Sequence, residues 1–266
     1  MASVTARASQ VKQPRGGYIN PSQLETIEFE DGYKLGEENI HPSIVGMTVD
    51  YLTRILTGGS VQAAFFSSVL GYLFRTRKLG RGTAGEDKRK KIDIDTLLST
   101  IKGLDDESII AACKATTYDV WYRNPRDAMH VRGAEETNPD ESTILNIRIM
   151  VNRGLEFFDK FGPVTASGFT FGVGYSDVVT SGDGDYLTKD ALWDFKVSKN
   201  APKSIDTLQI LMYFLMGEMS GKDIFFEGKK TKIGIFNPRL NKAYSIDIDA
   251  IPDEVMEEVM DKVICY

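Results

Sequence analysis

Two aspartates and a lysine lie close together in a segment whose composition favours β-strands. Asp185 ends a glycine-rich stretch, and Asp194 and Lys196 follow within the apolar run Ala191–Val197. The few residues between them are typical of a tight turn, so we expect a hairpin in which Asp185 lies roughly opposite Trp193. Alternate residues of a strand share a face, which places Lys196 beside Asp194. The pattern therefore predicts two carboxylates and an ammonium group gathered at one strand end.

This combination suits a divalent cation with oxygen ligands. A cation relieves the repulsion between two acids in a partly buried site, and magnesium is usually held by one or two carboxylates plus waters and substrate phosphate. A bound metal lowers the pKa of a water and polarises a phosphodiester, while a lysine stabilises the charge that develops. The sequence thus predicts a Mg²⁺ or Mn²⁺ site at Asp185 and Asp194. If the hairpin register shifts by two residues, Asp183 replaces Asp185.

An acid two residues before a lysine is weak evidence by itself, because the three occurrences in this chain are about what its composition predicts by chance. The occurrences at Glu86–Lys88 and Glu227–Lys229 lie in glycine- and charge-rich stretches that are typical of loops. Only the one at Asp194 lies in an apolar strand. Taken singly, the acids equally fit a polar turn, and Lys196 fits a strand-end lysine that extends to solvent.

The helix predicted after this strand adds a second signal. Residues 205–216 are apolar almost all round, as in a helix buried on most sides. Gln209 and Tyr213 nevertheless lie one turn apart on the same face. A buried glutamine needs hydrogen-bond partners, so we expect Gln209 and Tyr213 to reach the carboxylates or a catalytic water.

The runs GDGDYL, WDFKV and QILMY, in this order, resemble the PD-(D/E)xK nuclease superfamily, in particular its RecB-like and Cas4-like branch with GxxD, DxK and QxxxY elements. The resemblance implies a metal-dependent nuclease that hydrolyses phosphodiester bonds, of DNA more than of RNA. It assigns metal binding to Asp185 and Asp194, the catalytic amine to Lys196, and accessory roles to Gln209 and Tyr213.

Family members often carry a further metal-binding acid on the first core helix, and Glu156 is the best match. The family core is an αβββαβ unit. The resemblance covers about 120 residues at the C-terminal end. The first acid here follows glycine instead of proline. The sequence contains no cysteine cluster of the Cas4 type, so an iron–sulfur cofactor is not implied.

The elements that must position these residues indicate an α/β fold. Helical spacing over 143–160 is followed by strand-like segments, among them 164–171, 175–180 and 191–197, and then by the helix over 204–217, two strands and a closing helix. This order agrees with a restriction-endonuclease-like core over 141–266. Residues 25–140 are predicted to be mainly helical, and residues 1–24 to be a disordered tail.

The charge balance bears on possible partners. The formal net charge is -6 and the pI about 5.2, so an acidic chain has no overall field that attracts nucleic acid. Positive charge is concentrated in a basic loop over 75–91, which is either a solvated loop or a contact for the nucleic-acid backbone. Tyr118, Trp121 and Tyr122 either stack on bases or pack on neighbouring helices.

Other classes are disfavoured by what the sequence contains. Cys113 and Cys265 lie far apart and, with only two histidines, His41 and His130, disfavour zinc sites and disulfide scaffolds. No run is apolar enough for a secretory signal or a membrane span, so we expect a cytoplasmic protein without membrane contact. Cutting both strands of a duplex would require a homodimer or two successive events.

A second hypothesis fits the same residues. The chain then keeps the nuclease fold without turnover and acts as a nucleic-acid- or protein-binding component of a larger complex, such as a defence complex. The complete set of acids and lysine favours the enzyme, whereas the acidic balance favours the binding protein.

Overall fold

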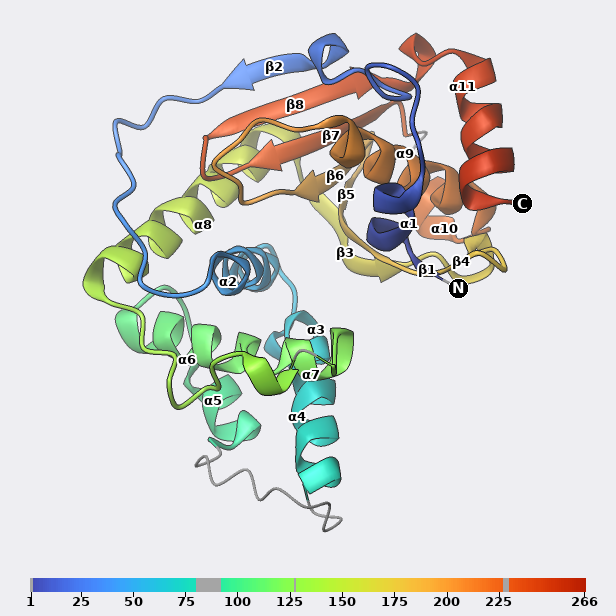
Figure 1. Ribbon diagram of the computed structural model, residues 1–266. Coiled ribbons are helices and arrows are strands. Elements are labelled where there is room, and N and C mark those ends of the chain that lie inside the picture. Colours follow the sequence, from blue (N-terminus) through green and yellow to red (C-terminus); the bar gives the residue numbers. More distant parts are fainter. Residues whose placement is uncertain (1, 80–91, 127, 227–229) are drawn as a thin grey trace. The chain divides into compact units, whose positions relative to one another are not determined.

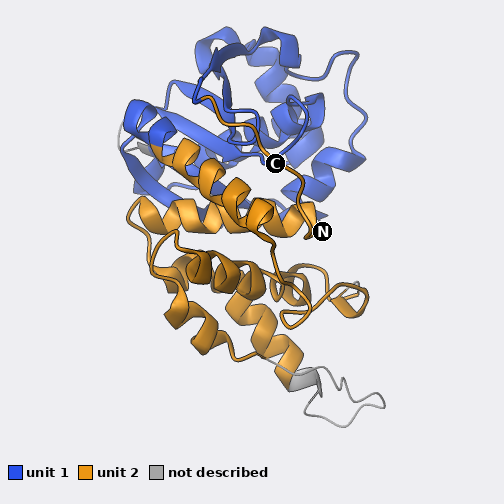
Figure 2. Ribbon diagram, turned by 90° about the vertical axis from the view of Figure 1, so that its left-hand side faces the viewer, with its two compact units in different colours: residues 1–31, 156–266 blue, residues 32–155 orange. Residues whose placement is uncertain are grey.

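The computed structural model describes residues 2–79, 92–126, 128–226 and 230–266. The chain forms two compact units, shown in Figure 2. Unit 1 comprises residues 1–31 and 156–266, and unit 2 comprises residues 32–155. The boundary predicted at residue 141 is therefore corrected. The division between the units instead lies between residues 155 and 156, inside helix α8 (Glu141–Phe161), and the first 31 residues join the C-terminal unit.

Unit 1 is built on a mixed six-stranded sheet with the order β2-β8-β7-β6-β5-β3 (Figure 1). Its strands are β2 (Glu25–Glu28), β3 (Val164–Thr170), β5 (Asp183–Thr188), β6 (Ala191–Phe195), β7 (Lys232–Asn237) and β8 (Lys242–Asp247). Only β6 and β7 pair in parallel. A parallel pair needs a crossover connection, which α9 (Ser204–Met219) supplies. The predicted α/β class is confirmed.

The two faces of the sheet are covered differently. One face packs on α9 and on the C-terminal helices α11 (Asp253–Glu258) and η5 (Val259–Ile264) through an aliphatic layer that includes Leu187, Leu192, Ile233 and Ile235. The opposite face packs on the end of α8 through an aromatic layer that includes Phe157, Phe158, Tyr186, Trp193 and Phe236. Every residue from Thr207 to Gly217 is buried, as the all-round apolar pattern of this helix predicts.

The N-terminal segment is ordered, so the prediction of a disordered tail over residues 1–24 is wrong. It forms β1 (Ala2–Ser3), α1 (Val4–Gln10) and the short 3₁₀ helix η1 (Pro21–Gln23). Val4 and Ala8, one turn apart, are fully buried in the core that contains α9. Ser3 caps α1 by accepting a hydrogen bond from the Ala6 amide. A short apolar stripe with a good cap is thus enough to dock this segment.

Two strands differ from expectation. The predicted strand over 175–180 is mostly irregular. Only β4 (Val179–Ser181) is extended, and it pairs with β1 in a separate two-stranded sheet. Strand β2 lies in the region expected to be helical, and it pairs with β8 at the edge of the main sheet. Its pattern of exposed, charged residues is typical of an edge strand and gives little hydrophobic signal.

Helices are the only regular elements among the described residues of unit 2, as the sequence predicts for this region, and irregular segments connect them. Its helices are α2 (Pro42–Leu56), α3 (Val61–Ala64), α4 (Phe66–Leu79), α5 (Ile94–Thr100), α6 (Asp106–Thr116), α7 (Asp119–Arg123), the 3₁₀ helix η2 (Ala128–His130) and the first part of α8. Side chains cap the starts of several of them. Asp93 and Asp105 accept from the Thr96 and Ser108 amides, which lowers the pKa of each aspartate.

The start of the predicted basic loop is not a surface feature. Arg75 is buried in α4, where its guanidinium lies 5.6 Å from the ring centres of both Tyr118 and Trp121. These two aromatic residues are themselves buried, so they pack against helices and do not form a surface for bases. Tyr122 is exposed. Residues 80–91 of the predicted loop lie outside the described residues.

No helix within the described ranges combines the length and the apolar character that a membrane crossing requires.

Candidate active site

The acid-bearing hairpin forms as expected, but its register differs by one residue. Tyr186, not Asp185, lies opposite Trp193, and Leu187 lies opposite Leu192. Directly opposite residues share a face of a sheet. The predicted register would have put Asp185 on the aromatic face with Trp193, whereas the observed one puts it on the α9 face with Asp194.

Asp185 is fixed at the point where β5 and β6 separate. Its Oδ2 accepts a hydrogen bond of 2.9 Å from the backbone amide of Phe195. The preceding glycine has a packing reason, because a Cβ at Gly184 would lie 2.3 Å from the ring of Phe169 on β3. The glycine therefore lets β3 and β5 approach closely just before the acid.

Asp194 and Lys196 lie together at the end of β6, as predicted. Asp194 is buried, with 4% of its surface exposed. The Lys196 ammonium is 3.6 Å from Asp194 Oδ2, and the lysine side chain is 30% exposed. The Lys196 amide donates to Phe236 O at 2.9 Å, which extends the β6–β7 ladder by one residue. This bond holds the lysine on the same face as Asp194.

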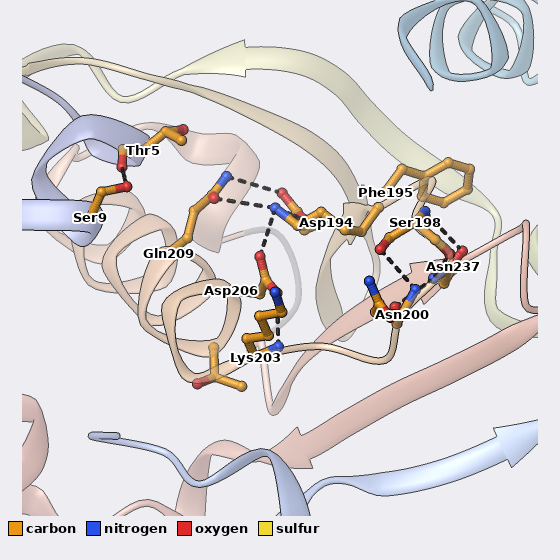
Figure 3. Close-up of polar contacts among 12 residues, drawn as sticks. Thr5, Ser9, Asp194, Phe195, Ser198, Asn200, Lys203, Asp206, Gln209 and Asn237 are labelled. Carbon is orange, nitrogen blue, oxygen red and sulfur yellow. Dashed lines mark hydrogen bonds and ion pairs between the residues drawn. The ribbon is translucent and has the colours of Figure 1, made fainter. Parts of the chain in front are cut away.

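Gln209 joins the strand residues to α9. Its Oε1 accepts from Lys196 Nζ at 3.3 Å, and its Nε2 donates to Asp194 Oδ1 at 3.5 Å and to the Tyr213 hydroxyl at 3.1 Å. Figure 3 shows Gln209 pointing from the helix toward Asp194. The glutamine thus orients both charged groups, as its place in a buried helix predicts.

Asp206 belongs to the site and was not predicted from the sequence. It lies in the first turn of α9, three residues before Gln209 and on the same face. Its Oδ1 is 3.2 Å from Lys196 Nζ, and its Oδ2 accepts from the Lys203 amide at 2.8 Å (Figure 3). Lys196 is consequently held between one carboxylate on β6 and one on α9. The spacing to Gln209 was the signal that could have revealed it.

The charges of the cluster act on one another. The Asp194 carboxylate, followed by that of Asp206, raises the pKa of Lys196, which keeps its ammonium protonated. Burial, with the charges of Asp194 and Asp185, raises the pKa of Tyr213, so its phenol remains neutral. Asp185 therefore lies within electrostatic reach of Lys196 and Tyr213.

A second unpredicted residue, Asn237, holds the loop that follows Lys196. This buried asparagine at the end of β7 donates from Nδ2 to Ser198 O at 2.8 Å and to Asn200 O at 3.3 Å. Its Oδ1 accepts from the amides of Ser198 and Arg239 at 3.4 and 3.0 Å. Figure 3 shows the contacts of Asn237 with Ser198 and Asn200. Asn237 thereby fixes the chain between Lys196 and α9.

Two of the predicted acids are exposed and lie at the margin of this cluster or outside it. Glu156 is exposed on α8, and among the described residues no hydrogen bond or ion pair joins it to Asp185 or Asp194. Asp183 shares the face of Asp185 but is exposed at the start of β5, opposite Thr170. Of the two alternatives for the first ligand, the geometry favours Asp185.

The cluster has the donor chemistry of a magnesium site with few protein ligands. Within the described parts of the chain, no group of three or more His, Cys, Asp and Glu side chains comes together. Two carboxylates on one face still match the usual need of Mg²⁺, which keeps several waters. Asp185 and Asp194 are the residues that fit such an ion.

Comparisons with models of protein families, with curated proteins and with solved structures found no match to this chain.

Proposed function

We propose that unit 1 is a metal-dependent nuclease of the PD-(D/E)xK type, which hydrolyses phosphodiester bonds of DNA in preference to RNA. The carrying observation is that Asp185, Asp194, Lys196, Gln209 and Tyr213 come from three elements and meet in one cluster on the α9 face. The element order α8, β3, β5, β6, α9, β7, with β6 and β7 parallel, supports a restriction-endonuclease-like core.

Energetics argue that the cluster serves more than stability. Asp194 is buried beside a layer of apolar side chains. Removing an ion from water costs several kcal/mol, and apolar side chains of similar volume often stabilise a fold as well or better. A network of two aspartates, a lysine and a glutamine inside this layer is therefore better explained by chemistry on a bound substrate.

The roles follow from the contacts. Asp185 and Asp194 would hold Mg²⁺ or Mn²⁺, which supplies an activated water and polarisation of the phosphate. Lys196 presents a protonated ammonium that orients the water and stabilises developing negative charge. Gln209 and Tyr213 fix the directions of Asp194 and Lys196, and Asp206 holds the lysine from the helix side.

A cleavage assay tests the proposal. Linear, circular and single-stranded DNA and RNA are incubated with Mg²⁺ or Mn²⁺ and with wild type, Lys196→Ala or Lys199→Ala. Lys199 is exposed three residues further along the same loop and serves as the matched control. We expect Lys196→Ala to lower the rate by about 10²- to 10⁴-fold and Lys199→Ala to leave it near wild type. Equal rates for the two variants would remove Lys196 from the mechanism.

One observation favours the second candidate function, a nuclease-fold protein that binds nucleic acid or a protein without cutting. Lys196 forms ion pairs with both Asp194 and Asp206, and such pairs can close a site that has lost turnover. Absence of cleavage with every substrate and both metals, combined with binding to nucleic acid or to a partner, would establish this candidate instead.

A further inference from the structure

Unit 2 contains a cavity of about 720 Å³ that the proposed nuclease reaction does not use. Its wall comes from three segments far apart in sequence, within residues 39–47, 116–120 and 130–138. All of them belong to unit 2. The volume lies within the range of about 300–1,000 Å³ that is typical of small-molecule sites.

Several side chains with hydrogen-bond donors line this cavity. His41 and His130, the only histidines of the chain, both line it, together with Arg132. His41 Nδ1 accepts from the Ser43 amide at 3.3 Å, so the proton of a neutral ring resides on Nε2. Among the described residues, His130 and Arg132 have no hydrogen bond or ion pair. All three side chains are exposed, so their N–H groups bind water in the free protein and can exchange it for the acceptor oxygens of a ligand.

Other polar groups of the wall are already engaged. Thr137 Oγ1 donates to Gly133 O at 2.9 Å, and Asn39 Oδ1 accepts from the Asp140 amide at 3.0 Å. The acid on this wall, Glu136, accepts from the Gly133 amide at 3.1 Å. The two histidines and Glu136 do not form a metal site, because no three His, Cys, Asp or Glu side chains come together within the described residues. The polar side chains of the wall that lack a partner among the described residues are His130 and Arg132, which can both donate.

The wall also has an apolar part. Its hydrophobic members are Ile40, Ile44, Met47, Val120 and Val131. A ligand that fits both parts has an anionic group for the arginine and histidines and a flat or apolar body for the aliphatic side chains. A phosphate accepts the forked hydrogen bonds of an arginine, and a nucleobase offers an apolar face.

We infer that this cavity binds a nucleotide, with the phosphate at Arg132 and the two histidines and the base against the aliphatic side chains. Two sources share this chemistry, a free mononucleotide and the 5′-phosphorylated end of a strand. The inference does not depend on nuclease activity, because its residues lie outside the Asp194–Lys196 cluster.

Isothermal titration calorimetry of the full chain tests it with AMP, adenosine, inorganic phosphate, and the dinucleotide TpT with and without a 5′-phosphate. AMP should bind at least tenfold more tightly than adenosine or phosphate alone. Arg132→Ala should weaken AMP binding about ten- to hundredfold. Arg126→Ala, an exposed arginine outside the cavity, should not change it. Tighter binding of 5′-phosphorylated TpT than of AMP would identify the strand end as the ligand. Tighter binding of AMP would identify the free nucleotide.

Glu136→Gln gives a test of sign. Removing the negative charge from the wall should strengthen AMP binding by about two- to fivefold, whereas it would weaken the binding of a cationic ligand. Equal affinities for AMP and adenosine, equal affinities for AMP and phosphate, or no heat with any probe overturn the inference. The titrations contain EDTA and no divalent cation, whereas the proposed nuclease function is measured as metal-dependent cleavage, so a failure of that function is distinguished from a failure of AMP binding here.

Discussion

The ion pair between Lys196 and Asp206 offers a measurement of how tightly the site holds its lysine. Asp206→Asn removes the charge but keeps an oxygen that can accept from the Lys203 amide. Two unit charges 3.2 Å apart attract by about 5 kcal/mol in an effective dielectric of about 20, before desolvation and ordering are subtracted. With side chains 30% and 18% exposed, we expect a net coupling of about 1–2 kcal/mol, above that of surface pairs.

The coupling is obtained from a double-mutant cycle of Lys196→Met and Asp206→Asn, measured by urea unfolding. The surface pair Lys262–Glu258, an i,i+4 pair 3.0 Å apart and largely exposed, is the control and should show a coupling of at most about 0.5 kcal/mol. Asp206→Ala should lower the free energy of unfolding by about 1 kcal/mol more than Asp206→Asn does, because it also removes the acceptor for the Lys203 amide at the start of α9. A Lys196–Asp206 coupling no larger than that of the control pair would refute the view that Asp206 holds the lysine.

Two further predictions concern a loop and a buried acid. Asn237→Ala should destabilise unit 1 by about 1–2 kcal/mol, since it removes several hydrogen bonds to partly buried backbone groups of the loop, and should lower cleavage more than Asn200→Ala does; equal effects of the two variants would contradict its role in placing Lys196. Asp119 in unit 2 is buried, with hydrogen bonds from Tyr51 and Ser68, and burial raises its pKa. Because the pKa is raised in the folded state, the stability that the protonated acid contributes decreases as the pH rises above about 4. Urea unfolding should therefore show that wild type loses stability more steeply with rising pH than Asp119→Asn does. Parallel pH profiles of the two proteins would argue against this assignment.

Local signals in the sequence were sufficient for most helices. Pro42 at the first helical position and Gly58 after the last turn mark α2, which spans Pro42–Leu56 as its pattern indicates. The acids at the start of α6 and the apolar run of α9 were equally informative. Such signals come from neighbouring residues, so a single sequence contains them.

The errors concern interactions between distant segments. Strand β2 pairs with β8 across more than two hundred residues, and its own side chains are charged or exposed. The hairpin register shifted by one residue because the turn is centred between Lys189 and Asp190, where Thr188 Oγ1 bonds both Asp190 Oδ1 and Ala191 O. A side chain that closes the turn in this way is not visible in the pattern of hydrophobicity.

The same distinction separates the predicted from the unpredicted site residues. Asp194 and Lys196 share a strand, and Gln209 and Tyr213 share a helix face, so periodicity alone grouped each pair. Asp206 and Asn237 act through the loop between β6 and α9, and their roles depend on partners from other elements. Arg75 shows the opposite error, because a basic run suggested a surface role for a residue that the helices bury.

Exposure within the cluster indicates the side from which a substrate would approach. Asp194 and Tyr213 are each 4% exposed, whereas Lys196 and Asp185 are only partly buried. The cluster is therefore open to solvent on the side of Lys196 and Asp185. A phosphate that approached from this side would reach Lys196 and the proposed metal ligands together. Asp194, Gln209 and Tyr213 lie deeper in the core, where Asp194 and Gln209 contact the lysine.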